Sequence, residues 1–269
     1  MTDLKNTLVP KKFKILLIGD SCVDEYYIGT CDRLNPEAPV PIINIKERYT
    51  TPGMAANVSE NLRNLGLQVD FITNDSKIVK KRYIDKRSGQ HLLRVDEEPT
   101  TKPWSGRRIN FSDSYDCLVI SDYNKGFLTY NHIEMLEKKF DCPIFLDTKK
   151  TDIGKFKKCF IKINLYEYNK IISQPDNLDN LIITNGENGA MLNTRHFSAP
   201  KVEVVDVCGA GDTFLSSLVF GYLTFDMDIG KAIQFANVAA SLTVQHRGNY
   251  APSYAQIISQ QEKLCQTLT

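Results

Sequence analysis

The chain has 269 residues, of which 42% are hydrophobic, and this is enough for the core of one large α/β domain. A net charge of +1 argues against a partner bound through charge alone, such as nucleic acid or an anionic membrane surface. No apolar run is long enough to span a bilayer, and the first 12 residues carry no signal-peptide core, so we expect a cytoplasmic protein.

The first third of the chain mixes two kinds of strand around one helix. Residues 13–18 (FKILLI) form a short apolar run typical of a buried parallel strand, whereas residues 39–47 alternate like a strand with one buried face. Residues 55–65 have helical periodicity and end at Gly66, a residue suited to a helix C-cap. Further strands are expected at 69–73, 78–84 and 91–95, the last two as a hairpin that forms a small separate sheet with residues 40–46.

From residue 115 onward the expected strands alternate with helices, which predicts a parallel sheet covered by helices. The strands are expected at 117–121, 144–147, 160–164 and 181–184, followed by an antiparallel pair at 190–193 and 201–205. The helices are expected at 131–140, 211–223, 229–245 and 254–266. The fold class is therefore α/β, and functional residues are expected where the parallel strands end.

The cysteines and histidines give no sign of a metal or disulfide framework. The 7 cysteines are scattered without a C-x-x-C pair, and the 4 histidines lack metal-ligand spacing. We therefore expect reduced thiols and no zinc site.

Residues 206–214 (DVCGAGDTF) are the most informative stretch, because they join a strand-like run to an apolar helix. The turn Gly209-Ala210-Gly211 at a helix N-terminus lets backbone N–H groups approach an anion, and the helix dipole favours that anion. Asp212 then places a carboxylate beside the anion site, which suits a general base facing a transferring phosphoryl group. The alternative is a simple strand–helix turn with an Asp at a stabilising helix position.

Two further segments suit recognition of a polar small molecule. Asp20 and Asp24 follow the first strand and offer carboxylates to sugar hydroxyls; alternatively, they are a solvated acid and a turn former. The segment from Gly53 to Asn57 opens a helix with small residues, and Asn57 can donate to and accept from hydroxyls. The alternative for this segment is close packing of helix and sheet.

The later strand ends carry residues suited to phosphates and a divalent cation. Asn164 and Glu167 can hold Mg²⁺-bound waters or phosphate oxygens, or can form a capping box. The glycines of residues 184–189 suit either a nucleotide-facing turn or a tight β-turn. Residues 121–126 (SDYNKG) and 147–149 (DTK) also end strands, and their lysines can neutralise phosphates. One cleft at the strand ends would collect all these residues.

Four motifs in this order resemble the ribokinase-like (PfkB) carbohydrate kinases over nearly the whole chain. They are Gly53-x-Ala55-Ala56-Asn57, Asn164-x-x-Glu167, Thr184-x-Gly186-x-x-Gly189 and Asp206-x-x-Gly209-Ala210-Gly211-Asp212. The resemblance implies one domain over residues 1–269, a three-layer α/β/α sandwich with a mostly parallel sheet and a small β-sheet lid at about 38–50 and 78–98. It also implies transfer of the γ-phosphoryl group of ATP to a sugar hydroxyl with Mg²⁺, and a homodimer formed through the lid.

Within this family, two stretches resemble the branch of heptose-phosphate kinases fused to an adenylyltransferase. They are residues 33–41 (RLNPEAPVP) and residues 121–126, in the context of Asn164 and Glu167. This likeness implies D-glycero-D-manno-heptose 7-phosphate as the acceptor, the 1,7-bisphosphate as the product, and a place in nucleotide-heptose synthesis for lipopolysaccharide or related glycans. No adenylyltransferase half follows, so a separate enzyme is expected to supply that activity.

The resemblance assigns roles residue by residue. Asp212 is the base, and Gly209, Ala210 and Gly211 form the anion hole. Asn164 and Glu167 organise Mg²⁺, and the nucleotide residues are Lys162, Thr184, Gly186, Glu187, Gly189, Asn237 and Gly248. The substrate residues are Asp20, Asp24, Gly53, Asn57, Asp122 and Lys125, with Arg33, Lys80, Arg82 and Arg94 as candidates for the phosphate of the sugar.

The chain departs from the family pattern in two places. Met54 stands where the family usually has a second glycine, and only residues 74–77 remain where relatives carry a helix, a strand and another lid segment. Two alternatives therefore stay open. One is a kinase for another sugar or sugar phosphate, and the other is a degenerate kinase that serves as a ligand-binding or scaffold subunit.

Overall fold

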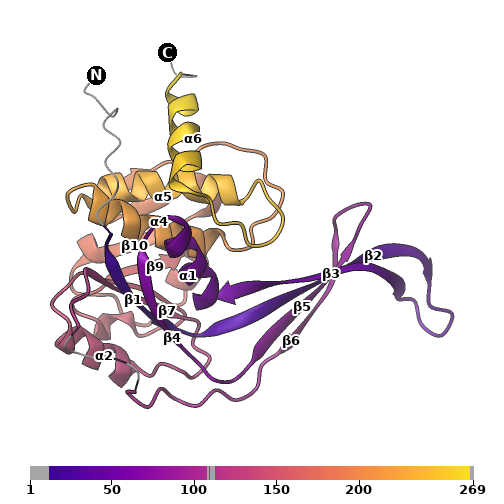
Figure 1. Ribbon diagram of the computed structural model, residues 1–269, viewed down its shortest axis with the longest axis horizontal. Coiled ribbons are helices and arrows are strands. Elements are labelled where there is room, and N and C mark those ends of the chain that lie inside the picture. The colour runs from indigo at the N-terminus through magenta and orange to yellow at the C-terminus, as the bar shows by residue number, and fades with distance from the viewer. Residues whose placement is uncertain (1–11, 108, 110–112, 267–269) are drawn as a thin grey trace.

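The structure, a computed structural model, describes residues 12–107, 109 and 113–266 (Figure 1). Residues 1–11, most of the N-terminal segment in which the sequence shows no signal-peptide core, lie outside the described residues. The main sheet has eight strands in the order β12-β11-β10-β9-β8-β7-β1-β4, parallel from β4 to β10 and antiparallel at β11 and β12. The strands are β1 (Lys14–Gly19), β4 (Gln68–Thr73), β7 (Cys117–Asp122), β8 (Ile144–Thr148), β9 (Phe160–Asn164), β10 (Leu181–Thr184), β11 (Ala190–Leu192) and β12 (Arg195–Phe197).

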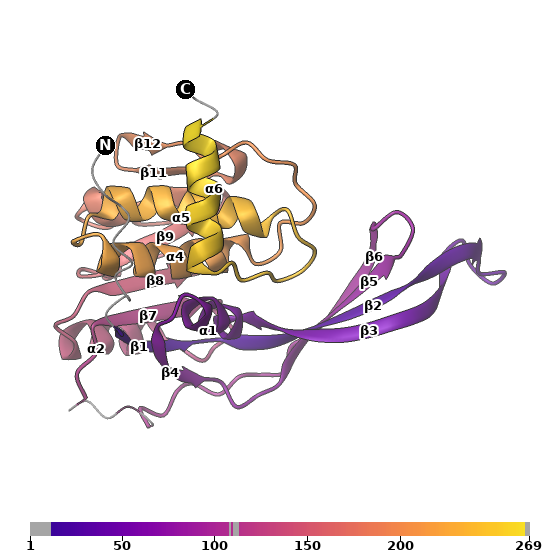
Figure 2. The ribbon, with the colours of Figure 1, turned by 45° about the horizontal axis from the view of Figure 1, so that its top comes forward.

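Helices cover both faces of this sheet because neighbouring side chains along each buried strand point to opposite faces. In β1, Ile15 and Leu17 belong to the core with α1, α4, α5 and α6, whereas Leu16 and Ile18 belong to the core with α2. Figure 2 shows α4, α5 and α6 on one face of the sheet. The helices are α1 (Ala55–Asn64), α2 (Tyr130–Lys139), α3 (Leu165–Tyr168), α4 (Ala210–Thr224), α5 (Ile229–Thr243) and α6 (Tyr254–Gln266). The α/β/α sandwich expected from the sequence is confirmed.

A second sheet of four strands extends away from the sandwich as a long arm (Figures 1 and 2). Its order is β3-β2-β5-β6, with β2 and β5 parallel and the outer pairs antiparallel. The strands are β2 (Ser21–Leu34), β3 (Pro41–Met54), β5 (Ile78–Asp85) and β6 (His91–Glu97). The arm is therefore joined to the sandwich where β1, α1 and β4 meet it.

One expected strand is wrong, and one observed strand was not expected. No strand was expected over residues 21–34, yet they form β2, which continues from β1 after Asp20 alone. Residues 201–205 were expected to be a strand, but they are irregular, and the edge of the sheet is formed by β12 instead. Val204 and Val205 are more than half exposed, so their β-branched side chains mark a surface rather than a sheet.

The short connection between β4 and β5 is a built turn. The buried side chain of Asn74 accepts the backbone N–H of Ser21 at 2.7 Å and donates to the carbonyl of Ser76 at 2.6 Å. Residues 74–77 thus tie the arm to the main sheet without an intervening helix. The connection that is short in the sequence is therefore a turn held by the hydrogen bonds of Asn74.

Within the described residues, no helix has both the length and the apolar character that crossing a membrane requires. The six cysteines whose side chains are described are free.

Candidate active site

The candidate site lies at the carboxyl ends of the parallel strands, beside the start of α4. A cavity of about 660 Å³ opens there. It is lined by residues from the ends of β8, β9 and β10, from α4 and α5 and from the irregular segment 199–207. Parallel strands collect their end residues in this way, as expected for an open α/β sheet.

The Gly-Ala-Gly turn begins α4 with a backbone that only glycine adopts easily. Gly209 has φ 74°, in the left-handed region, and a Cβ on it would lie 2.8 Å from Asn249 Oδ1 and 2.9 Å from Asn57 Nδ2. A Cβ on Gly211 would lie 3.1 Å from the ammonium of Lys162. The turn therefore packs tightly against polar groups of three other segments. The first two residues of α4, Ala210 and Gly211, form part of the cavity wall, so the N-terminus of the helix faces the cavity.

Asp212 lies in the first turn of α4 and is buried, with 5% of its surface exposed. Asn57 of α1 donates to Oδ2 at 2.8 Å, and the hydroxyl of Tyr123 donates to Oδ1 at 2.7 Å. Burial raises the pKa of Asp212 to about 6, against the lowering effect of these two hydrogen bonds. A carboxylate with this pKa is ionised at neutral pH and still accepts a proton readily, as a general base must.

Asn57 is itself held in place by a polar network inside the helical layer. Asn61, one turn later in α1, donates to both the backbone and the side-chain oxygen of Asn57, at 2.9 and 3.2 Å. Thr213 of α4 donates to Asn61 Oδ1 at 3.0 Å. The network joins α1 to α4, so that the orientation of Asn57 toward Asp212 is fixed.

Asn164 and Glu167 form a capping box at the start of α3. Asn164 Oδ1 accepts the backbone N–H of Glu167 at 2.8 Å, and Glu167 Oε2 accepts that of Asn164 at 2.9 Å. The second carboxylate oxygen of Glu167 pairs with Lys149. Nearby, the buried Lys162 pairs with Asp147 at 2.7 Å. Because Asn164, Lys149, Lys162 and Asp147 all line the cavity, the capping geometry is compatible with a phosphate-binding role.

These donors suit a magnesium ion that keeps most of its own waters. Among the described residues, no group of three or more His, Cys, Asp or Glu is arranged to hold a metal. Asp147 Oδ1, however, is buried without a hydrogen-bond partner, and it lies with Glu167 and Asn164 at neighbouring strand ends. Mg²⁺ commonly binds through one or two carboxylates together with waters and substrate phosphates, so this oxygen-only set fits it.

Most of the expected nucleotide residues line the same cavity. Thr184, Gly186, Glu187, Gly189 and Asn237 all contribute to its wall. Gly248 lies outside this wall: its N–H donates to Asp206 Oδ2 at 2.9 Å, and a Cβ on it would meet Tyr26.

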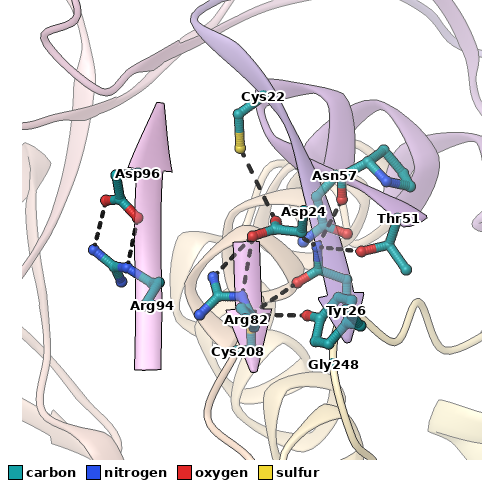
Figure 3. Close-up of polar contacts among 12 residues, drawn as sticks. Cys22, Asp24, Tyr26, Thr51, Asn57, Arg82, Arg94, Asp96, Cys208 and Gly248 are labelled. Carbon is teal, nitrogen blue, oxygen red and sulfur yellow. Dashed lines mark hydrogen bonds and ion pairs between the residues drawn. The ribbon is translucent and has the colours of Figure 1, made fainter. Parts of the chain in front are cut away.

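On the side of the arm, Asp24 forms the centre of a buried polar cluster (Figure 3). Arg82 of β5 donates to Asp24 Oδ1 through Nε at 3.1 Å and Nη2 at 2.8 Å. Asn249 donates to Oδ2 at 3.3 Å, and a Cβ on Gly53 would lie only 2.2 Å from that oxygen. The tyrosine of the cluster, Tyr26, contacts the thiol of Cys208 at 3.7 Å.

Asp20 is fully buried and lies in the chain between β1 and β2. Its two carboxylate oxygens accept the backbone N–H groups of Lys125 and Phe127 at 3.3 and 3.4 Å. Burial, followed by the charge of Asp122, raises the pKa of Asp20. Asp20 therefore fixes the loop after β7, and Asp24 is the carboxylate nearer to Asn249 and Gly53.

The remaining predicted substrate residues are dispersed. Asp122 is buried and engaged by Thr148 at 2.5 Å and Lys150 at 3.2 Å, while the ammonium of Lys125 pairs with Glu98 at 2.6 Å. Arg94 on β6 pairs with Asp96, separately from Asp24 and Arg82, as Figure 3 shows.

Of the cations expected for the sugar phosphate, Lys80 is the best placed and Arg33 the worst. Among the described side chains, no carboxylate lies within ion-pair distance of Lys80, whose ammonium is 5.7 Å from the centre of the Tyr123 ring. Arg33 lies nine residues beyond Asp24 on the same strand, which is roughly 30 Å at the rise of a β-strand. Within one chain, Arg33 is therefore not brought to the site.

Sequence reasoning missed three site residues. Tyr123 and Asp147 were passed over although each stands in a strand-end segment that was noted for its lysine, and Asn249 lies in no motif. The signal for Tyr123 and Asp147 was their position at the ends of β7 and β8. Asn249 offered no local signal, because most of its hydrogen-bond partners lie about 200 residues earlier in the chain.

The chain is similar in sequence to known carbohydrate kinases. Residues 165–256 match the pfkB family of carbohydrate kinases. The bifunctional protein HldE of Aliarcobacter butzleri is 29% identical over 316 positions, covering 96% of this chain and 66% of the relative. HldE of Pseudomonas syringae is 31% identical over 295 positions, covering 89% and 61%. The chain thus spans less than two thirds of these relatives, and the alignments exceed its own 269 residues, so the relatives carry residues that this chain lacks.

Solved structures resemble the whole fold. Phosphofructokinase-2 from Escherichia coli in complex with potassium has a TM-score of 0.71 at 15% identity, covering 94% of this chain and 99% of that one. Ribokinase from Thermotoga maritima has a TM-score of 0.68 at 15% identity, covering 93% and 99%. These likenesses show a ribokinase fold. Within this fold, residues 165–256 match the pfkB family of carbohydrate kinases, and the HldE relatives extend the sequence likeness over most of the chain.

Proposed function

We propose that this protein transfers the γ-phosphoryl group of ATP to a hydroxyl of a sugar phosphate, with D-glycero-D-manno-heptose 7-phosphate as the acceptor and the 1,7-bisphosphate as the product. The observation that carries the proposal is Asp212: a buried carboxylate, with a pKa of about 6, in the first turn of α4 behind the Gly209–Gly211 turn. General bases of this kind are tuned by burial to work near neutral pH.

In the proposed reaction, Asp212 accepts the proton of the sugar hydroxyl while its oxygen attacks the γ-phosphorus. The bond from the γ-phosphorus to the bridging oxygen breaks, and ADP leaves with the electron pair. The N-terminus of α4, with Lys162 beneath Gly211, stabilises the charge on the transferring group. Asn164 and Glu167 would hold Mg²⁺ through its waters, and the ion would neutralise charge on the phosphates.

The cavity provides space and chemistry for the nucleotide. Its volume of about 660 Å³ is within the range of small-molecule sites. Its wall carries the cations Lys149 and Lys162, the latter beside Gly211, and apolar side chains such as those of Val202, Ala240 and Val244 from the 199–207 segment and α5. These groups suit phosphates near the start of α4 and an adenine base between the 199–207 segment and α5.

The acceptor is proposed to bind on the side of the arm, between Asp24 and Asp212. Asp24 and Asn249 can bind sugar hydroxyls, and Lys80 supplies positive charge for the phosphate. The choice of heptose rests on residues 33–41 and 121–126 and on relatives named HldE. A different sugar phosphate is the second candidate. Buried Met54, which packs with Cys22 and Ile78 where the family usually has glycine, favours it.

The assembly and the cellular setting are also proposals. We propose a homodimer formed through the arm, which would bring the Arg33 end of one arm near another copy. We further propose a cytoplasmic location, because the substrates are charged metabolites. A separate adenylyltransferase would act on the product.

A panel of acceptors tests the proposal. ADP release with Mg-ATP is measured with the heptose 7-phosphate, fructose 6-phosphate, ribose and no sugar. Turnover with the heptose phosphate well above the other acceptors supports the full proposal. Preference for another sugar phosphate overturns the acceptor but keeps the kinase. ATP binding without turnover on any acceptor would instead support a ligand-binding or scaffold subunit.

A further inference from the structure

The hydroxyl of Tyr123 occupies the position on Asp212 that an acceptor hydroxyl needs. It donates to Oδ1 at 2.7 Å, while Asn57 donates to Oδ2 at 2.8 Å. Both oxygens of the base therefore carry a protein donor. A base removes a proton only from a group within hydrogen-bond reach. Each carboxylate oxygen can accept two hydrogen bonds, but Asp212 is only 5% exposed and little room remains beside these donors, so we expect a substrate hydroxyl to take the place of one of them.

Asn57 is not the donor that yields. It is buried, and Asn61 and Thr213 hold it in the network between α1 and α4. Tyr123 has a different setting, because it lies in the loop after β7 and is only partly buried. The exchangeable position on Asp212 is thus Oδ1, and the exchangeable donor is Tyr123.

The ring of Tyr123 stands between the two halves of the site. On one side it lines the cavity proposed for the nucleotide, and on the other it packs against Cys22, Met54 and Ile78 at the base of the arm. The ammonium groups of Lys80 and Lys149 lie 5.7 and 5.2 Å from its ring centre. A side chain in this position separates the γ-phosphate end of the nucleotide cavity from the acceptor side.

We propose that Tyr123 is a gating residue: its hydroxyl stands in for the acceptor on Asp212, excludes water from the base, and swings aside when the sugar hydroxyl arrives. The inference rests on the proposed function, since it takes Asp212 as the base. Without the gate, water at Oδ1 would give its proton to Asp212 while its oxygen attacks the γ-phosphorus, and ATP would be hydrolysed to ADP and phosphate. Exclusion of water from a kinase site serves to prevent this side reaction.

The test is Tyr123→Phe, which keeps the ring and removes only the hydroxyl. The matched control is Tyr115→Phe, which removes another tyrosine–aspartate hydrogen bond, 2.9 Å from the hydroxyl to Asp70 Oδ2, on the surface away from the site. Hydrolysis of Mg-ATP without acceptor is expected to rise about tenfold in Tyr123→Phe. In the wild type, water must first displace the hydrogen bond from Tyr123 to Asp212, and the free energy of that hydrogen bond corresponds to roughly this factor in rate. The control should not change it.

Two further measurements separate gating from a structural role. Asp212→Asn added to Tyr123→Phe should return hydrolysis to the background, because the water reacts through that base. In the presence of the acceptor, Tyr123→Phe should lower the KM for the sugar and raise the ATP consumed per sugar phosphorylated above one. Loss of a merely structural residue would lower kcat without uncoupling ATP consumption from phosphorylation of the sugar.

The pH profile gives an independent readout. The pKa of Asp212 depends on hydrogen bonds from Asn57 of α1 and Tyr123 and on the charges of Asp147 of β8 and Lys162 of β9. Two further titratable groups, Cys22 and Lys149, interact electrostatically with Asp212. Because the tyrosine hydrogen bond favours the ionised carboxylate, its loss should raise the pKa of Asp212 by about one unit. The acidic limb of kcat/KM should move upward by the same amount.

The outcomes separate this inference from the proposed function. If the wild type phosphorylates a sugar but Tyr123→Phe hydrolyses no more ATP than Tyr115→Phe, the gate is wrong and the kinase stands. If no sugar is phosphorylated, hydrolysis by the two variants still decides the gate. Should neither hydrolyse ATP, carboxyl NMR of Asp212, assigned with Asp212→Asn, decides it: an unchanged titration in Tyr123→Phe overturns the inference.

Discussion

The guanidinium of Arg82 donates two hydrogen bonds to a single oxygen of Asp24, at 3.1 and 2.8 Å, across two neighbouring strands of the arm. The side chains are 13% and 5% exposed, so the pair is nearly removed from water. The sequence assigns Arg82 to the phosphate of the sugar, but this geometry makes it the partner of the carboxylate proposed to bind sugar hydroxyls. The arm therefore holds its own counter-charge for Asp24.

Replacing Arg82 by Ala leaves the Asp24 carboxylate buried without its cation. We expect a loss of about 3 kcal/mol in the free energy of unfolding, measured by urea titration, together with a higher KM for the sugar. Arg94→Ala is the matched control, because its pair with Asp96 is far more exposed, at 53% and 28%. It should change the unfolding free energy by no more than about 0.5 kcal/mol. Equal losses in both variants would contradict the role given to Arg82.

The pKa of Asp212 predicts the acidic limit of activity. With a pKa of about 6, the carboxylate is ionised above pH 6 and protonated below it, and the protonated form cannot accept the hydroxyl proton. The kcat/KM should therefore fall below pH 6, reaching about one tenth of its plateau at pH 5. Circular dichroism at pH 5 checks that the protein stays folded. A plateau that extends down to pH 4.5 in folded protein would be incompatible with Asp212 as the base.

Gly209 should tolerate no side chain, because two separate constraints meet there. Gly209→Ala puts a Cβ into a left-handed backbone and within 3 Å of Asn57 and Asn249. We expect a fall in kcat of about 100-fold, as when a donor to the developing charge is lost. Gly66→Ala is the control, since Gly66 has φ 89° but no atom within 4 Å of its would-be Cβ.

The control should show backbone strain alone. Gly66→Ala is expected to lose about 1 kcal/mol of stability, by thermal or urea unfolding, with unchanged kcat. Full activity in Gly209→Ala would mean that the Gly-Ala-Gly turn does not surround the transferring phosphoryl group.

The parallel strands and the helices that follow them could be predicted because each carries its own local pattern. The run at residues 13–18 and the apolar helix after Gly211 need no long-range information. The strand β2 could not be predicted in this way. Its buried positions include Asp24 as well as Tyr26 and Ile28. A carboxylate at a buried position argues against a strand unless its partner is known, and that partner, Arg82, lies 58 residues later in the chain.

Residues 201–205 were misjudged for the opposite reason. Val202, Val204 and Val205 alternate like a strand, yet Val202 and Val204 line the cavity, and Val204 and Val205 are exposed. Valines that form the wall of a binding site have the same pattern as valines that fill a sheet, because periodicity records which residues share a face and not what covers that face. Tyr123 stands at the end of β7, which marks it as a site candidate, but its hydrogen bond to Asp212, 89 residues away, cannot be predicted from local sequence.

The most direct test of the account is phosphoryl transfer by Asp212→Asn. The variant replaces a buried carboxylate by an amide of the same shape, which keeps one acceptor oxygen for Asn57 and can donate to the hydroxyl of Tyr123, so it should fold and should still bind ATP. On the best acceptor of the panel, its kcat should fall by roughly 10²–10⁴-fold, the usual contribution of a general base. Turnover close to that of the wild type in this folded, ATP-binding variant would contradict the assignment of Asp212 as the base.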